Sequence, residues 1–146
     1  MVLTPNCDTA LIIAGGKGTR LQSINPNLPK SLFKIGDQPL LFHQINLLKK
    51  YQFKTVHLLL GEQSEQIKKA IDTRSDWGMD IICHEEKDPE GTGGCLRVLK
   101  NQMTTNFVMI YGDIMLNMDL KKLITFHHQS QSDLTLVVHP NDHPFD

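Results

Sequence analysis

Residues 9–21 read TALIIAGGKGTRL and join an apolar run to a glycine-rich segment. Its first part, residues 9–14, is a continuous apolar run of strand length, which is typical of a strand buried on both faces of a parallel sheet. Glycines follow at once, and residues 15–31 (GGKGTRLQSINPNLPKS) form a long connection rich in glycine, proline and asparagine. Because long ordered loops are commonly functional, the stretch predicts a central strand that leads into a functional loop.

Strand-like and helix-like segments alternate along the rest of the chain. This alternation predicts a layered α/β domain with a mainly parallel sheet. We expect Ser64 to cap the second helix and Asp119 to cap the last one. Besides residues 9–14, the expected strands are residues 54–60, 79–84, 106–111 and 133–139, and the expected helices are residues 39–51, 64–71, 92–101 and 119–128.

Composition and charge restrict the class of protein. The 146 residues include 15 basic and 16 acidic side chains and are 40% apolar, as in one ordinary domain that can form its own core. Without a long basic run, nucleic acid is not an expected partner, and without an apolar run near ~20 residues, neither is a membrane. Three widely spaced cysteines without a zinc pattern indicate a reducing compartment, so we expect a cytoplasmic protein.

Most of the glycines gather in two short stretches, residues 15–18 and residues 91–94. Glycine allows backbone N–H groups to approach a ligand closely and to form a concave nest for an anion such as phosphate. Arg20 and Lys30 lie in the same loop as the first cluster and supply positive charge. Two tight structural turns are the alternative, but the long loop and its two cations favour a phosphate site.

Two common phosphate motifs do not fit the first cluster. A P-loop needs Ser or Thr after its lysine, whereas Lys17 is followed by Gly18. A dinucleotide fingerprint that begins at Gly16 needs a third glycine where Leu21 stands. Both ordinary ATPases and dinucleotide-dependent oxidoreductases are therefore disfavoured.

Five motifs follow one another along the chain. They are residues 11–21 (LIIAGGKGTRL), the pair Pro29-Lys30, residues 36–40 (GDQPL), residues 86–94 (EKDPEGTGG), and residues 111–113 (YGD) with Asp119-Leu120 behind them. In order and spacing they resemble the hallmarks of the sugar-1-phosphate nucleotidylyltransferases. Glu90 departs from the pattern, since the family usually carries leucine there. Residues 139–146 (HPNDHPFD), the Cys95 loop and the long N-terminal loop look most like the D-glycero-D-manno-heptose 1-phosphate guanylyltransferase branch, with mannose 1-phosphate guanylyltransferases as near relatives.

The resemblance implies a Rossmann-like three-layer sandwich, the N-terminal part of the nucleotide-diphospho-sugar transferase fold. Complete family members continue past the position that matches Asp146, so residues 1–146 are expected to be the nucleotide-binding part of an incomplete domain. The segments that bind the sugar and supply a second metal-binding aspartate would then be absent. The resemblance therefore also implies weak metal binding and little turnover for this chain alone.

The reaction that the resemblance implies is attack by a sugar 1-phosphate on the α-phosphorus of a nucleoside triphosphate, with GTP favoured and pyrophosphate released. Positioning and charge neutralisation dominate such catalysis. Arg20 would bind the β- and γ-phosphates, Lys30 the groups at the reacting centre, and Asp113 a Mg²⁺ ion. The partners would be these two substrates, and a homo-oligomer is an open option. Further nucleotide-binding residues would be Ala14, Gly15, Gly16, Gly18, Thr19, Gly91, Thr92 and Gly93.

Competing interpretations stay open at this point. Asp113 could simply cap a turn after its strand, although the carboxyl end of a strand is where open α/β sheets bind ligands. A noncatalytic subunit that binds a nucleotide or a sugar nucleotide is the main functional alternative. Retention of Arg20, Lys30 and Asp113 together favours the enzyme.

Overall fold

The computed structural model describes residues 7–15, 25, 27–86, 96–97, 99–103 and 105–138. The chain forms two compact units. The sheet unit is Asn6–Met118, and the helix unit consists of Asp119–Asp146 together with Met1–Pro5.

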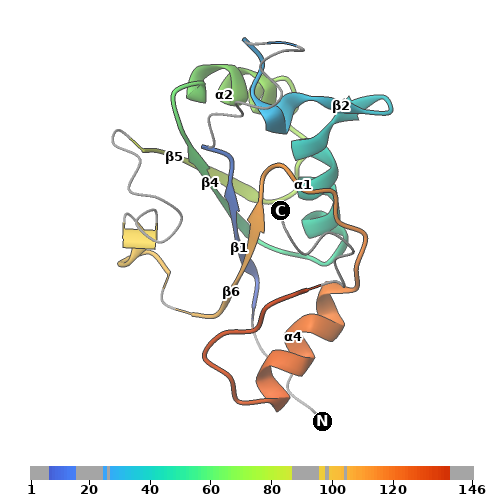
Figure 1. The fold of residues 1–146 in the computed structure, drawn as a ribbon, viewed down its shortest axis with the longest axis vertical. Helices are drawn as coiled ribbons and strands as arrows, with labels where there is room; N and C mark the ends of the chain where they lie inside the picture. Colours follow the sequence, from blue (N-terminus) through green and yellow to red (C-terminus); the bar gives the residue numbers. More distant parts are fainter. Residues whose placement is uncertain are drawn as a thin grey trace, which may run out of the picture. The chain divides into compact units, whose positions relative to one another are not determined.

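The sheet unit is built on four parallel strands (Figure 1). In sheet order they are β5 (Asp80–Glu85), β4 (Thr55–Leu60), β1 (Thr9–Ile13) and β6 (Phe107–Tyr111). The apolar β1 therefore lies between two neighbours, as its continuous apolar sequence predicts. The expected parallel α/β sheet is confirmed.

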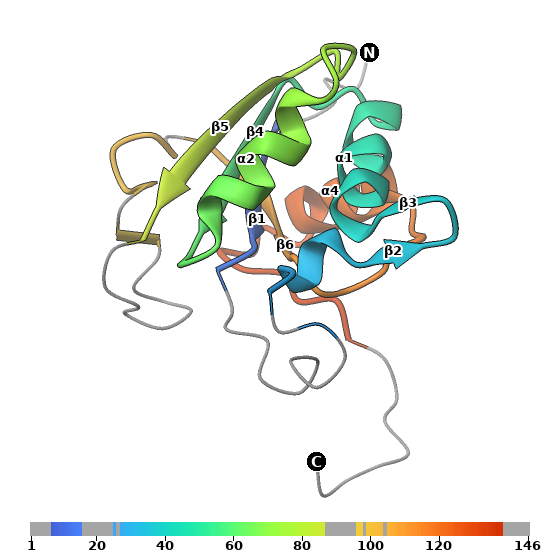
Figure 2. The same ribbon diagram turned by 90° about the horizontal axis from the view of Figure 1, so that it is seen from above.

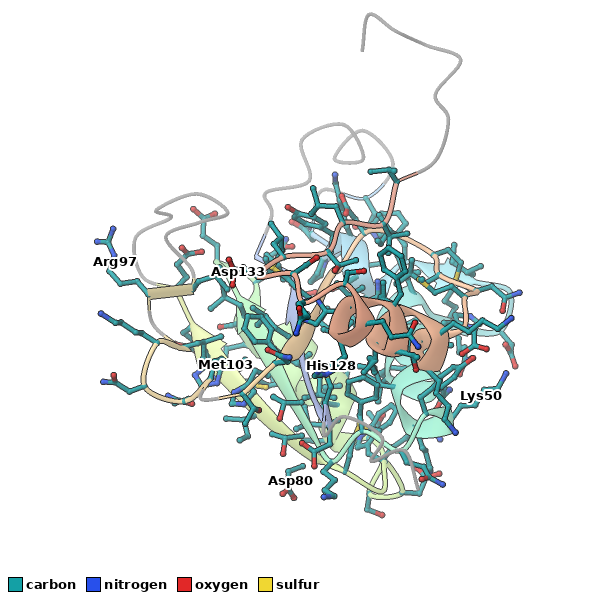
Figure 3. The ribbon with its side chains drawn as sticks, turned by 90° about the horizontal axis from the view of Figure 1, so that it is seen from below. Lys50, Asp80, Arg97, Met103, His128 and Asp133 are labelled. Carbon is teal, nitrogen blue, oxygen red and sulfur yellow. The ribbon has the colours of Figure 1, made fainter. Side chains whose placement is uncertain are left out.

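The order of the strands places helices on both faces of the sheet. The chain moves outward from β1 to β4 and β5 through α1 (Leu40–Lys50) and α2 (Ser64–Asp72), and these two helices lie on the same face (Figure 2). It then returns to the other side of β1, so a right-handed crossover must pass over the opposite face. The segment that makes this return includes Arg97 and Met103, which Figure 3 labels.

Alternation along the strands divides the core between the two faces. Ile12 and Leu58 are fully buried on the face that α1 and α2 cover. Leu11 and Leu59 point the other way and pack with Leu99 of the returning segment. Leu96, Met103 and Phe107 complete this second cluster as partly buried members, together with Ile13. The three-layer arrangement thus follows from the strand order and the residue alternation.

A short region between β1 and α1 prepares the position of Lys30. Residues Lys30–Leu32 form a single 3-10 turn, η1, and β2 (Lys34–Ile35) pairs with β3 (Gln38–Pro39) in a small hairpin. The hairpin turns at Gly36, whose φ of +68° favours glycine. Leu32 is buried, which anchors η1 against the rest of the unit.

The helix unit contains α4 (Leu120–Gln129). Asp119 caps this helix as predicted, because its Oδ1 accepts a hydrogen bond from the Lys122 N–H at 3.1 Å. The strand predicted at residues 133–139 is wrong for the described residues 133–138, which pair with no strand. A strand exists only where its N–H and C=O groups find a neighbouring backbone, and an apolar sequence alone does not supply one.

The structure differs from the sequence predictions at the start of α2 and in residues 92–101. Ser64 is not a cap: Gln63 occupies the cap position without a side-chain hydrogen bond, and Ser64 is the first residue of α2. Its hydroxyl turns instead to Glu85 on the neighbouring strand. Of the helix predicted at residues 92–101, residues 96–97 and 99 are helical and residues 100–101 form a turn, while residues 92–95 and 98 lie outside the described residues.

Candidate functional site

The strand order reverses at one place in the sheet. From β1 the chain continues to β4 on one side, whereas β6 lies on the other side. In open α/β sheets, ligands bind at the carboxyl ends of the two strands where the order reverses. Here these two strands are β1 and β6, and the residues after them are Ala14 and Gly15, and Gly112 and Asp113.

The backbones at these two strand ends approach each other closely. Gly112 donates its N–H to the Ile13 carbonyl at 2.8 Å. A Cβ on Gly112 would lie 2.8 Å from the Ile13 oxygen and 3.1 Å from the Ala14 Cβ, so no larger residue fits without movement. The glycine of the YGD motif therefore allows Asp113 to follow β6 directly beside the end of β1.

A second close approach holds the other side of the β1 end. Ala14 donates its N–H to the Leu59 carbonyl at 2.8 Å. A Cβ on Gly61 would lie 2.6 Å from the Gly15 oxygen, which leaves no room for a side chain there. Gly61 was not among the sequence-predicted site residues. The sequence feature that could have indicated Gly61 is its position directly after β4, where a glycine permits the contact with Gly15.

Lys30 reaches the end of β6 from η1. Its Nζ lies 3.6 Å from the Asp113 Oδ2, and the side chains of Lys30 and Asp113 are 27% and 52% exposed. The turn is tied down by hydrogen bonds from Leu32 N–H to Pro29 and from Phe33 N–H to Lys30. The structure thus brings together one cation and one carboxylate, 83 positions apart in the sequence, that were both predicted as site residues.

Gln44 is a polar residue at this site that the sequence analysis missed. It lies on α1, is 1% exposed, and donates hydrogen bonds from Nε2 to the carbonyls of Tyr111 and Ile114, at 2.8 and 2.7 Å. The signal was present in the sequence, because Gln44 stands three residues after Leu41 and four before Leu48. An amide within an apolar helical stripe needs a partner in the interior.

The carboxyl ends of β4 and β5 carry a different set of contacts. Glu85, the last residue of β5, accepts hydrogen bonds from the Ser64 hydroxyl at 3.1 Å and from the Lys68 ammonium. Lys68 also binds Glu65 at 3.1 Å, on the surface of α2. These two glutamates raise the pKa of Lys68, with the Glu85 hydrogen bond as the largest cause.

Two histidines face each other on the sheet surface that Leu99 covers in part. His57 on β4 and His84 on β5 share a hydrogen bond of 2.8 Å between Nδ1 and Nε2, and their rings stack at 5.1 Å. Burial lowers the pKa of both side chains, and the neighbouring His84 lowers that of His57 further. The lowered pKa values favour the neutral form of both imidazole rings.

Several predicted residues lie outside the described part of the chain. These are Gly16, Gly18, Thr19 and Arg20 of the first glycine loop, and Gly91, Thr92 and Gly93 of the second, together with Glu90. The first loop leaves β1 beside Asp113, and the second leaves the carboxyl end of β5 after Glu86.

The donor set at Asp113 fits the Mg²⁺ ion that the resemblance implies. Magnesium prefers hard oxygen ligands and is commonly held by one or two carboxylates with substrate phosphates and water. Asp113 offers one half-exposed carboxylate after the end of β6. Among the described residues no group of three or more histidine, cysteine or acidic side chains is arranged to hold a metal.

Comparison with known proteins decides the family. A family model described as Nucleotidyl transferase matches residues 9–145. The chain belongs to this family. The resemblance to sugar-1-phosphate nucleotidylyltransferases, drawn from the motifs, is thereby confirmed.

In the described part of the chain, no helix has the length and apolarity that are needed to cross a bilayer.

Relatives within the nucleotidyl transferase family include several guanylyltransferases. A probable mannose-1-phosphate guanylyltransferase 2 from Arabidopsis thaliana is 30% identical in an alignment that covers 92% of this chain and 39% of the relative. A mannose-1-phosphate guanylyltransferase catalytic subunit beta from Drosophila pseudoobscura pseudoobscura is also 30% identical, over 95% of this chain and 38% of its own length. The chain thus spans about two fifths of these relatives.

Solved structures agree with the family. HddC from Yersinia pseudotuberculosis, crystallised as a complex with GMP-PN, is 27% identical, with a TM-score of 0.74 over 82% of this chain and 53% of HddC. A UDP-glucose pyrophosphorylase complexed with UDP-glucose has a TM-score of 0.70 at 17% identity, over 86% of this chain and 54% of its own. The second likeness shows the fold alone.

Proposed function

We propose that this chain is the nucleotide-binding part of an enzyme that joins GTP to a sugar 1-phosphate, giving a nucleotide sugar and pyrophosphate. The observation that carries the proposal is the pairing of Lys30 and Asp113, 3.6 Å apart, at the carboxyl ends of β1 and β6. The guanylyltransferases among the relatives and the GMP-PN complex of HddC support guanine as the base.

Charge explains why a triphosphate fits this site. Two phosphates that react with each other also repel each other, so the site must neutralise charge and hold both groups in line. Lys30 has a flexible side chain that can turn from Asp113 to a phosphate oxygen. In the proposed complex its ammonium binds the oxygens at the reacting centre.

The glycine loop that follows β1 would hold the triphosphate. Gly15 begins this loop beside Gly61, where the backbone is packed too closely for side chains. In the proposal, Gly15, Gly16, Gly18 and Thr19 bind phosphates, and Arg20 binds the β- and γ-phosphates of the leaving pyrophosphate. Ala14, Gly91, Thr92 and Gly93 line the space for the base and the ribose.

Asp113 is the proposed ligand for magnesium. A bound Mg²⁺ would neutralise phosphate charge and orient the transferred group. The carboxylate of Asp113 would exchange its contact with Lys30 for the metal, while Lys30 moves to phosphate.

The two free thiols described, Cys7 and Cys83, fit a reducing cytoplasmic compartment.

The proposal is tested by pyrophosphate release from the natural full-length protein. GTP, CTP, UTP and dTTP are each supplied with several sugar 1-phosphates and Mg²⁺. We expect the highest kcat/KM with GTP, and no turnover after the metal is removed with a chelator. Turnover with another triphosphate in preference to GTP would overturn the base assignment. Binding of GTP without any turnover would favour the noncatalytic nucleotide-binding subunit.

The assigned residues are tested in the same assay. Arg20→Ala or Asp113→Ala should lower turnover by about 10²-fold or more, the range for the loss of one group that stabilises transition-state charge. Asp113 is half exposed and follows β6, so circular dichroism of Asp113→Ala should show an intact fold. Unchanged rates would refute the assigned roles.

A further inference from the structure

We propose that Gln44 is a positioning residue for Asp113, because its side-chain amide fixes the short loop that carries this carboxylate. The inference rests on the proposed function, in which Asp113 meets magnesium and phosphate. Gln44 belongs to none of the sequence motifs of the site. It reaches the loop from α1, 67 positions before Tyr111 and 70 before Ile114.

The geometry of the amide is specific. Nε2 carries two protons and donates to two carbonyls, those of Tyr111 at 2.8 Å and Ile114 at 2.7 Å. These residues stand on either side of the pair Gly112-Asp113. Since both partners are carbonyl oxygens, only the nitrogen of the amide can face them, so its orientation is chemically determined.

Burial separates this contact from ordinary surface bonding. Gln44 is 1% exposed, and its Oε1 has no hydrogen-bond partner among the described residues. A buried oxygen without a partner is unfavourable, and methionine or leucine would fill similar space without it. Packing of α1 therefore does not require an amide at this position, and both hydrogen bonds of the amide go to the loop carbonyls.

The loop is held from both sides. On one side, Gly112 bonds the Ile13 carbonyl at 2.8 Å and packs against Ala14. On the other side, Gln44 binds the carbonyls that precede and follow Gly112-Asp113. The Asp113 side chain, 52% exposed, then projects from a backbone with little freedom to move. A carboxylate that must share one metal ion with substrate phosphates benefits from such a fixed position.

The effect of losing such a contact is known in magnitude. Groups that orient a metal ligand without touching the metal typically contribute about 10–100-fold to metal affinity or activity. Gln44→Met keeps an unbranched side chain of similar length and removes both donors. Gln44→Glu keeps the shape but turns a carboxylate oxygen toward two carbonyls. Its activity and metal affinity should therefore fall further than those of Gln44→Met.

The experiment measures kcat, KM for GTP and the apparent affinity for Mn²⁺ in the full-length protein. For Gln44→Met we expect kcat and Mn²⁺ affinity to fall by about 10–100-fold, with KM for GTP at saturating metal nearly unchanged. The control is Leu48→Ala, one turn along α1 at a fully buried position. It should lower the denaturation midpoint while kcat per folded molecule and Mn²⁺ affinity stay near wild type.

A second measurement separates this inference from the proposed function. Amide hydrogen exchange of residues 112–115 should accelerate in Gln44→Met more than in Leu48→Ala. If the wild type has no turnover with any triphosphate, the proposed function fails, and the exchange rates still decide whether Gln44 holds the loop. Unchanged exchange at residues 112–115, or wild-type kcat and Mn²⁺ affinity in Gln44→Met, would overturn the role of Gln44.

Discussion

The carboxyl ends of β1 and β6 and those of β4 and β5 share one edge of the sheet but are held by different kinds of contact. At β1 and β6, a buried amide and two backbones in van der Waals contact fix Asp113. At β4 and β5, the flexible and partly exposed side chains of Lys68 and Glu85 meet each other. Both regions contain a lysine and a carboxylate, but the loop that carries Asp113 is held by a buried side-chain amide, whereas the contact between Lys68 and Glu85 joins two partly exposed side chains.

Substitution of Gly112 should have the largest effect on this difference. In Gly112→Ala the new Cβ would lie 2.8 Å from the Ile13 carbonyl, so β1 and β6 must separate locally. We expect a loss of about 1–3 kcal/mol in the free energy of unfolding, as for overpacking of a core. Turnover should fall by about 10²-fold as Asp113 moves. Urea denaturation and pyrophosphate release measure the two effects.

Gly36→Ala is the matched control for Gly112→Ala. A Cβ on Gly36 meets nothing within 4 Å, and its φ of +68° imposes only a left-handed strain of about 1–2 kcal/mol. The two variants should therefore lose similar stability, while only Gly112→Ala loses turnover. Equal losses of turnover would show that general destabilisation, and not the β1–β6 contact, governs activity.

The two lysines give the next test. Lys30→Met should lower turnover by about 10²-fold, because it removes the cation beside Asp113 and leaves that carboxylate to face phosphate alone. Lys68→Met removes an equivalent ammonium at the β4–β5 end and should leave kcat near wild type. Pyrophosphate release from both variants measures the contrast. A similar loss in both would place the triphosphate across the whole edge of the sheet.

The fold could be predicted well because burial leaves a strong signal in sequence. The apolar run at residues 9–14 and the alternating helical segments predicted the parallel sheet, and β1, β4, β5 and β6 confirm it. The failed prediction at residues 133–139 shows the limit of that signal. A run of valine and leucine favours an extended backbone, but the partner strand is a property of the tertiary structure.

The candidate site was predictable only in part. Lys30 and Asp113 follow strands or loops with strong local signatures, so their residue types indicated the chemistry. Gln44 and Gly61 act through distant backbone atoms, the carbonyls of residues 111 and 114 and of Gly15. No pattern along the chain states which carbonyl a side chain will reach. The sequence shows such a residue only as a polar or small residue in an unexpected place.

The histidine pair predicts a pH dependence on the β4–β5 side. The pKa of His57 and that of His84 are lowered in the folded state, while the unfolded chain has ordinary values near 6.5. As the pH falls below about 6.5, the unfolded state binds more protons, so stability is lost toward the lower folded pKa. Above about pH 6.5 the histidine pair does not make the free energy of unfolding depend on pH.

Urea denaturation between about pH 7.5 and about pH 5.5 measures this dependence. The midpoint of the wild type should decrease as the pH falls, and the decrease should be smaller in His57→Leu/His84→Leu. Asp8 and Asp76 also have lowered pKa values, but the stability that their carboxylates contribute to the fold is lost only at more acidic pH. A wild-type midpoint that rises or stays constant over this range would contradict the assignment of neutral histidines.

Ser64 provides the smallest expected effect. A serine that caps a helix contributes about 1 kcal/mol, whereas Ser64 is the first residue of α2 and directs its hydroxyl to Glu85 at 3.1 Å. In Ser64→Ala the lost hydrogen bond and the better helix propensity of alanine should nearly cancel, so the free energy of unfolding changes by less than about 0.5 kcal/mol. Asp119→Ala removes a real cap and should cost about 1 kcal/mol. If both variants lost the same stability in urea, the hydrogen bond between Ser64 and Glu85 would contribute as much as a helix cap. The carboxyl ends of β4 and β5 would then be held more firmly than the partly exposed side chains of Lys68 and Glu85 indicate.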